Sequence, residues 1–123
     1  MQAKLKVVLF NPDAVFFDMP LALLAIGSAL DPAKYEVVIV DARIEKNYTK
    51  RLLTELENAV CLGITVLTGN PLNSALEVSL LAKNANPEVP VIWGGWHTSI
   101  FPKQTLHDVN AVDITVQRRR RNF

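Results

Sequence analysis

Five short apolar runs constrain the fold of this chain more than any other feature. They begin about 22 to 30 residues apart and comprise Leu5–Phe10, Tyr35–Val40, Val60–Thr65, Val89–Trp93 and Ala111–Val116. β-Branched residues are frequent in them, and the runs are almost continuously apolar, which indicates strands buried on both faces. Strands of this kind are typical of parallel sheets that helices cover on both sides.

Helix-forming segments separate the five runs. They are Pro20–Leu30, Tyr48–Asn58, Leu72–Ala85 and Lys103–His107. In the first segment, Leu21, Leu24, Ala25 and Ser28 lie on one stripe at helical spacing. The alternation of strand and helix predicts successive βα units closed by a fifth strand.

With right-handed crossovers, this alternation predicts an α/β fold that is flavodoxin-like (Rossmann-like), with a doubly wound, five-stranded parallel sheet in the order 2-1-3-4-5. Ligands of such sheets bind outside the carboxyl ends of the strands, where the strand order reverses, here above the first and third strands. The loops at that edge are residues 11–19, 65–70 and 94–99, together with the segment after Val116.

Composition excludes several classes of protein. The longest apolar runs fall far short of the roughly 20 residues that cross a bilayer, so no membrane span is expected. Thirteen basic and twelve acidic residues leave a formal charge of +1, which favours neither nucleic acid nor an anionic membrane as the main partner. The single cysteine, Cys61, excludes an internal disulfide and a cysteine-ligated cluster made by this chain alone, and it favours a cytoplasmic setting.

The last seven residues, QRRRRNF, differ from the rest of the chain. We expect residues 1–116 to form one domain and residues 117–123 to form a basic tail. The tail has two interpretations: a patch for nucleic acid or phosphate, or a disordered, solvated end produced by truncation. No second basic cluster supports the patch, so the second interpretation is preferred.

Motifs for the usual occupants of this fold are absent. The loop after the first strand, NPDAVFFDMP, contains no glycine and no G-x-G-x-x-G, which argues against NAD or FAD binding. There is no Walker phosphate loop. The third and fourth strands are instead followed by small and hydroxyl-bearing residues, Thr65-Val66-Leu67-Thr68-Gly69 and Gly94-Gly95-Trp96-His97. Glycine lets a backbone approach a broad ligand and also permits a positive φ.

The sequence resembles the cobalamin (B12)-binding domain found at the N-terminus of B12-dependent radical SAM enzymes. The resemblance covers nearly the whole chain, through "PLALLAIGSAL", "YEVVIVDA", "CLGITVLTGN", "NPEVPVIWGGWHTSIFP" and "VDITV". In that family a catalytic barrel follows, and a C-x-x-x-C-x-x-C motif in it binds a 4Fe-4S cluster. This chain has neither, so the cluster and S-adenosylmethionine are expected only in a missing catalytic domain.

The resemblance implies a role for the loop after the third strand. Thr65 and Leu67 fit the hydroxyl-x-Leu pattern that touches the nucleotide tail of cobalamin in related domains, and Thr68 and Gly69 line the same loop. The alternative for Thr65 is a structural role, in which its hydroxyl only forms a hydrogen bond at the end of the strand.

The resemblance also implies roles after the fourth strand. Gly94 and Gly95 match a Gly-Gly pair that lets the cofactor tail pass close to the strand. Trp96 either packs on that tail or belongs to the core. His97 is expected to hydrogen-bond the tail or to pack beside Trp96, and not to ligate cobalt.

The first loop lacks the D-x-H-x-x-G motif that supplies an axial imidazole in methionine-synthase-type domains. Asp13 is present, but no histidine precedes His97. We therefore expect cobalamin to be held without a protein histidine ligand. Phe17 either presses on the corrin ring or covers the sheet edge, and it could equally meet the missing barrel. His107 is expected on a surface helix and Asp41 as a cap or turn residue.

The function inferred from the residues and the resemblance is a cobalamin-binding module of a B12-dependent radical SAM methyltransferase or cyclase. It lacks the barrel, has no catalytic residues of its own, and would not be an enzyme alone. The alternative is a flavodoxin-like protein-interaction module without a cofactor. This alternative predicts oligomers, and for the cobalamin-binding module a homo-oligomer formed through the exposed domain interface is left open.

Overall fold

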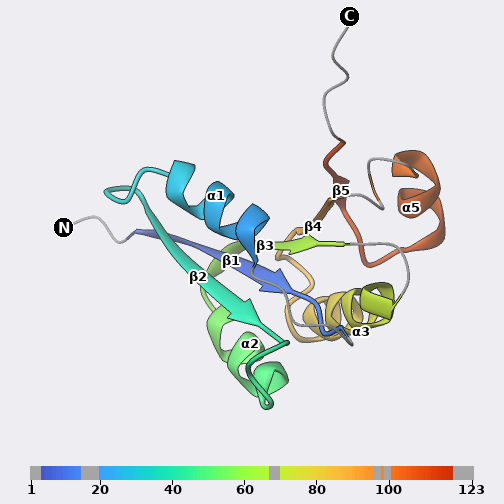
Figure 1. Cartoon of the computed structure of the whole chain (residues 1–123), viewed down its shortest axis with the longest axis horizontal. Helices are drawn as coiled ribbons and strands as arrows, with labels where there is room; N and C mark the ends of the chain where they lie inside the picture. The colour runs from blue at the N-terminus through green and yellow to red at the C-terminus, as the bar shows by residue number, and fades with distance from the viewer. Residues whose placement is uncertain (1–3, 15–19, 67–69, 96–97, 99–100, 118–123) are drawn as a thin grey trace, which may run out of the picture.

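The computed structural model describes residues 4–14, 20–66, 70–95, 98 and 101–117. These residues form a three-layer α/β arrangement with the sheet in the middle (Figure 1). Within these ranges, no helix has the length and apolar character needed to cross a bilayer.

The central sheet has five parallel strands in the order β2-β1-β3-β4-β5, as the sequence predicts. The strands are β1 (Leu5–Asn11), β2 (Tyr35–Asp41), β3 (Ala59–Thr65), β4 (Val91–Gly94) and β5 (Ile114–Thr115). Strand order reverses between β1 and β3, because the chain leaves β1 for β2 on one side and later enters β3 on the other. This is the predicted α/β, flavodoxin-like fold.

The helices are distributed unequally over the two faces of the sheet. They are α1 (Leu21–Ala29), α2 (Tyr48–Leu56), α3 (Asn70–Ala85) and α5 (Pro102–Asp108). Figure 1 shows α1 on one side of the sheet and α2 and α3 on the other. Helix α5 lies beside β5 and borders a groove with α3.

The main core lies between the sheet and helices α2 and α3. Val8, Phe10, Leu62 and Val91 are inaccessible to solvent there, as is Trp93. The indole Nε1 of Trp93 donates a hydrogen bond to Ser79 Oγ at 2.9 Å, and the Ser79 hydroxyl donates to Ala75 O at 2.7 Å. The buried indole nitrogen is therefore satisfied by a helix hydroxyl, as burial of a polar atom requires.

A smaller apolar cluster lies under α1, on the opposite face. Its buried members are Val7, Leu9 and Leu23. Helix α1 approaches the sheet closely at Gly27, where a Cβ would lie 3.1 Å from Val37 Cγ1. The predicted stripe of Leu21, Leu24, Ala25 and Ser28 is not the packed one, because all four residues are exposed. Since α1 is apolar all round, its periodicity could not identify the side that packs.

The last two strands are shorter than the sequence predicts. Pro90 has no N–H to donate, and β4 begins only at Val91, although Pro90 O still accepts a hydrogen bond from Leu62 N at 2.9 Å. Ala111 and Val112 are buried, but they precede the two residues of β5, and Val112 N donates to Val109 O in a turn. Burial of an apolar run therefore did not imply strand geometry over its whole length.

Candidate functional site

The carboxyl ends of the strands come together at one edge of the sheet. Thr65 of β3 pairs in register with Gly94 of β4, and Asn11 of β1 pairs with Asp41 of β2. The reversal of strand order between β1 and β3 makes this edge the expected ligand site of an open α/β sheet.

A strip of small side chains follows β3 and β4 on the face that carries α1. Side chains alternate along a strand, and Ile64 and Trp93 are buried in the core on the α2–α3 face. Thr65 and Gly94 therefore face the α1 side. A Cβ added at Gly94 would meet only Val116 Cβ, at 3.8 Å, which is an ordinary contact. Gly94 thus leaves accessible space beside Thr65.

The same strip is narrower toward the amino-terminal end of β3. A Cβ at Gly63 would lie 2.9 Å from Leu9 Cδ2, so the Leu9 side chain already covers this glycine from the β1 side. Cys61 lies in β3 as predicted; it is half-buried, and desolvation raises the pKa of its thiol. The strip is thus uncharged along its length and most open near the strand ends.

Gly95 has a different role from Gly94. Its φ is +97°, and an added Cβ would lie 2.9 Å from Val66 O, 3.0 Å from Val66 N and 3.1 Å from Thr65 Oγ1. The adjacent hydrogen bond from Val66 N to Gly94 O, 2.8 Å, draws the two chain segments together. Glycine is therefore required at position 95 by the turn and by the close approach of Val66.

Thr98 is a site residue that the sequence analysis did not single out. It is fully buried, and its Oγ1 lies 3.2 Å from Gly95 O and 3.0 Å from Val116 O. The single hydroxyl proton is shared between these two carbonyl oxygens, so Thr98 connects the loop after β4 to the segment after β5. Its only sequence signal is a hydroxyl residue close to the Gly-Gly pair.

A buried polar pair fixes the start of the loop after β1. Asn11 Nδ2 donates to Asp41 Oδ1 at 3.0 Å, and Arg43 N donates to the same oxygen at 3.0 Å. Arg43 Nε also donates to Pro12 O at 3.2 Å. Asp41 is therefore a turn residue, as predicted, and Asn11 and Arg43 were missed because their roles depend on contacts between strands.

The structure describes some of the predicted site residues and not others. Thr65, Gly94 and Gly95 lie together, while Asp13 lies in the loop after β1, exposed, with its backbone N–H donating to Ser74 Oγ at 2.9 Å. The rest lie outside the described residues: Phe17, Leu67, Thr68, Gly69, Trp96 and His97. The predicted tail, 117–123, is likewise undescribed except for Gln117.

The described residues contain no group of three or more His, Cys, Asp or Glu side chains that could hold a metal ion. His107 lies on α5, as predicted, with 88% of its side chain exposed. Its Nδ1 lies 2.9 Å from Asp108 Oδ1, and the hydrogen bond from His107 lowers the pKa of the Asp108 carboxyl. This pair is solvent-exposed and lies within α5, outside the strand-end loops.

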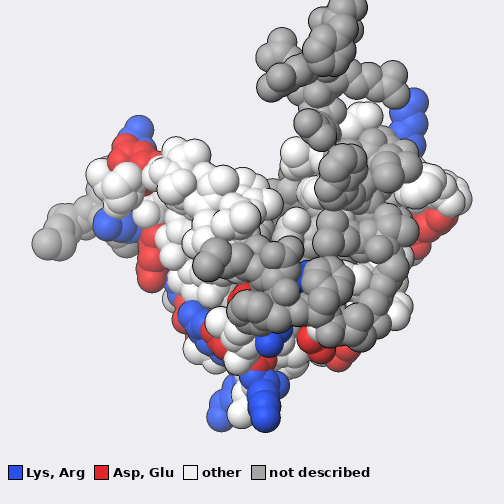
Figure 2. All heavy atoms as spheres, in the orientation of Figure 1, with Lys and Arg blue, Asp and Glu red and all other residues white. Residues whose placement is uncertain are grey.

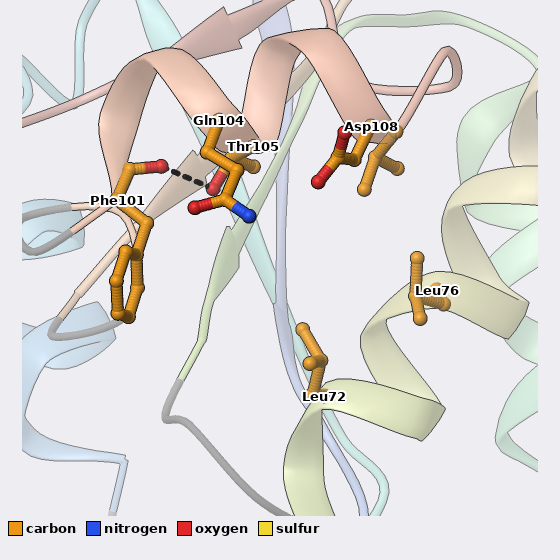
Figure 3. A pocket seen from close by; sticks show the side chains of 7 residues that line it. Leu72, Leu76, Phe101, Gln104, Thr105 and Asp108 are labelled. Carbon is orange, nitrogen blue, oxygen red and sulfur yellow. Dashed lines mark hydrogen bonds between the residues drawn. The ribbon is translucent and has the colours of Figure 1, made fainter.

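A separate groove of about 280 Å³ lies between α3 and α5 (Figure 3). It is lined by Leu72, Leu76, Phe101, Gln104, Thr105, Asp108 and Val109. In Figure 3 the leucines rise from α3 below, while Thr105 Oγ1 donates to Phe101 O at the α5 side. Its volume falls just below the roughly 300–1,000 Å³ of small-molecule pockets, so it does not suit a corrinoid.

The strip at the sheet edge fits a corrinoid tail through its shape and not through an unpaired polar group. Among the described residues, no buried side-chain nitrogen or oxygen lacks a hydrogen-bond partner, so no orphaned polar group calls for a ligand. What fits is space: the missing side chain of Gly94 beside Thr65, on an uncharged face. This arrangement suits the flat, largely apolar base of a nucleotide tail better than the phosphate of that tail.

Comparison with known proteins agrees with the geometry. Residues 7–122 match the family described as B12 binding domain. No curated protein matches the chain. The match includes the parallel sheet except for the first two residues of β1, and it includes the edge at which Thr65 and Gly94 lie. The chain therefore belongs to the B12-binding domain family.

Proposed function

We propose that this protein binds cobalamin at the carboxyl edge of its sheet, with the nucleotide tail of the cofactor entering over Thr65 and Gly94. The observation that carries the proposal is the open space at Gly94 beside a strand-end hydroxyl. Membership of the B12-binding domain family supports cobalamin as the ligand.

The strand ends supply the fixed part of this site. The Thr65 hydroxyl hydrogen-bonds the tail, Gly94 leaves room for it, and Gly95 holds the loop against Val66. Thr98 keeps that loop joined to the end of β5 through Val116 O. These residues bind and orient the cofactor and take no part in bond making.

The loops outside the described residues supply the remaining walls in this proposal. Leu67, Thr68 and Gly69 follow Thr65 after one intervening residue, Val66, and Trp96 and His97 follow Gly95 directly. Each of the two groups therefore starts within a few residues of the Thr65–Gly94 pair, which supports their place at the tail.

The first loop makes the remaining contribution. Asp13 is held near α3 by Ser74, and Phe17 follows four residues later to meet the corrin ring. When bound, cobalamin supplies a cobalt centre able to carry an alkyl group. We infer that cobalt receives no histidine nitrogen from this chain, since D-x-H-x-x-G is absent, His97 meets the tail in this proposal, and His107 is exposed on α5.

We further propose that the domain serves a radical SAM enzyme, whose barrel would hold the 4Fe-4S cluster and S-adenosylmethionine. The support is the sequence resemblance, from "PLALLAIGSAL" to "VDITV". The genomic reading frame after the codon for Val116 tests this extension. Three closely spaced cysteines downstream support it, and an unrelated domain there contradicts it.

Cobalamin binding is tested by titrating the purified chain with hydroxocobalamin and desalting the mixture. The expected result is a coloured protein fraction with a shifted corrin absorption spectrum. Gly94→Val is expected to abolish retention, because its side chain fills the space beside Thr65. Ala85→Val, at an exposed position at the far end of α3, is the matched control and is expected to bind like wild type.

The two parts of the proposal fail separately. A wild-type chain that remains colourless contradicts cobalamin binding itself. A Gly94→Val chain that is folded by circular dichroism and binds as tightly as wild type contradicts only the placement of the tail.

A further inference from the structure

The loop after β1 begins beside a polar pair that is buried more deeply than its chemistry favours. Asn11, the last residue of β1, is 3% exposed, and Asp41, the last residue of β2, is 5% exposed. The residues before them, Phe10 and Val40, belong to the main core. Burying an amide and a carboxyl costs free energy that their hydrogen bonds only offset, and apolar side chains of similar volume often stabilise a core equally well. Stability alone is therefore a weak reason for this pair, and local geometry is the stronger one.

The Asp41 side chain organises the turn that follows β2. Its Oδ1 accepts a hydrogen bond from Arg43 N at 3.0 Å. The main-chain oxygen of Asp41 accepts from Ile44 N at 3.2 Å and from Glu45 N at 3.0 Å. A side-chain oxygen that accepts from the backbone two residues further on forms an Asx turn. This turn brings the Arg43 side chain to the loop after β1, where its Nε donates to Pro12 O at 3.2 Å.

Helix α3 holds the same loop from the other side. Strand β1 lies between β2 and β3 in the sheet, and α3 follows β3. Ser74, near the start of α3, is 8% exposed, and its Oγ accepts from Asp13 N at 2.9 Å. The backbone N–H of Asp13 is thus bound within the molecule, while the residue as a whole is exposed. The start of the loop is therefore held on both sides, by the turn after β2 and by α3.

These contacts together restrain residues 11–13. We call the side chains that make them the loop clamp, which consists of Asn11, Asp41, Arg43 and Ser74. On the face drawn in Figure 2, Lys and Arg are mixed with Asp and Glu around the end of β2 and around α2, so neither sign of charge dominates there. Individual hydrogen bonds, and not a field of one sign, therefore place this backbone.

We propose that the side chains of the loop clamp are positioning residues for cobalamin. They fix the backbone of residues 11–13 before the cofactor binds, and they do not touch it themselves. The exposed Asp13 is thereby presented at the carboxyl edge of the sheet, where Thr65 and Gly94 also lie. A segment that is ordered in advance loses less conformational entropy on binding, so affinity rises without a new contact. This inference rests on the proposed function.

The fixed backbone is tested without cobalamin, by amide hydrogen exchange of the full chain measured by NMR. The Asp13 amide is expected to exchange slowly, because it donates to a buried hydroxyl. Ser74→Ala removes this acceptor and is expected to speed exchange at Asp13 by about fivefold or more. The amide of Val8, in the middle of β1, reports on the core and is expected to exchange at the wild-type rate.

The effect on the cofactor is tested by absorbance titration with hydroxocobalamin. Ser74→Ala is expected to raise Kd by about fivefold or more, because residues 11–13 must then be ordered at the moment of binding. Asn86→Ala is the matched control. Asn86 Nδ2 donates to Leu56 O at 3.1 Å, near the amino-terminal ends of β3 and β4. This variant also loses one hydrogen bond between a side chain and the backbone, and it is expected to lower stability while leaving Kd unchanged.

A reciprocal exchange tests the buried pair itself. Asn11→Asp places two carboxyl groups against each other and leaves no amide to donate, so it is expected to weaken both the fold and cobalamin binding. Adding Asp41→Asn to this variant restores one amide and one carboxyl, and an oxygen remains to accept from Arg43 N. The double variant is expected to return Kd to within about twofold of wild type, which a loss of packing alone would not produce.

Three results would overturn the inference. One is an Asp13 amide that exchanges freely in the cofactor-free wild type, which would mean that the backbone is not fixed in advance. Another is a folded Ser74→Ala chain that binds cobalamin as tightly as wild type. The third is an equal rise in Kd for Asn86→Ala, which would mean that any loss of stability weakens binding. A wild-type chain that stays colourless contradicts the proposed function and this inference with it, whereas the three results above leave cobalamin binding intact.

Discussion

Thr65 and Gly94 stand side by side at the ends of β3 and β4, paired in parallel register. One of them offers a hydroxyl and the other no side chain, on a face of the sheet that α1 covers only in part. Because the next residue, Gly95, turns with φ of +97° against Val66, the backbone rather than a side chain forms this part of the edge. Gly94 therefore provides space and Gly95 permits the turn, and substitutions at the two positions can distinguish these roles.

Gly95→Ala is expected to destabilise the fold. The new Cβ would stand 2.9 Å from Val66 O in a left-handed conformation, which costs an L-residue about 1–2 kcal/mol before any clash is counted. Urea unfolding followed by circular dichroism measures the loss. Gly94→Ala, whose Cβ makes an ordinary 3.8 Å contact, is the control and is expected to unfold like wild type. Equal stability of all three chains would contradict the close approach.

Thr65→Val is expected to weaken cobalamin binding without weakening the fold. The substitution keeps the branched shape and removes the hydroxyl, and a lost neutral hydrogen bond of about 1 kcal/mol corresponds to roughly a fivefold rise in Kd. Absorbance titration with hydroxocobalamin gives the ratio, and a parallel unfolding curve gives the stability. Thr54→Val, on the exposed side of α2, is the control. Unchanged affinity would mean that the Thr65 hydroxyl only completes its strand.

Most of the fold could be predicted because one feature, the spacing of apolar β-branched runs, is sufficient for a parallel sheet. The predicted strand order is that of flavodoxin-like sheets, which right-handed crossovers permit, and it is confirmed. The packed side of α1 could not be predicted, since leucines and alanines surround the whole helix. The length of β5 was overestimated, because Ala111 and Val112 are buried in a turn and not in a strand.

The site was predictable only where local chemistry is unusual. The Gly-Gly pair attracts notice in a chain with five glycines, and Thr65 falls at the end of a run. Asn11 and Thr98 were not identified, because their hydrogen bonds reach residues 30 and 18 positions away. A single sequence does not show such pairings until the strands are placed beside one another.

Asp41→Ala is expected to destabilise the protein by about 1–3 kcal/mol, because it leaves the buried Asn11 amide and the Arg43 N–H without their shared acceptor. Asp41→Asn retains a side-chain oxygen at the same place and is expected to lose less. Chemical denaturation of the three chains measures the difference. If the alanine variant is as stable as wild type, the pair does not hold the start of the loop after β1.

Asp113→Asn tests a pH-dependent contribution at the last strand. Partial burial of the Asp113 carboxyl opposes ionisation, but the hydrogen bonds from Lys83 and from Val91 N, the latter 2.8 Å, prevail and lower its pKa from 3.8. A carboxyl with a lowered folded-state pKa stabilises the protein above its unfolded-state pKa, and the contribution disappears as pH falls through the folded-state value. With 40% of the side chain exposed, the contribution is expected not to exceed about 1 kcal/mol.

The asparagine variant keeps an acceptor for Val91 N and removes the charge that faces Lys83. At neutral pH and low salt it is therefore expected to be slightly less stable than wild type, and the two urea unfolding curves are expected to converge as the pH falls below about 4. High salt should narrow the neutral-pH difference, because the ion pair is partly exposed. A difference that is constant from neutral to acidic pH would show that Asp113 acts as a hydrogen-bond acceptor alone, with its charge contributing nothing.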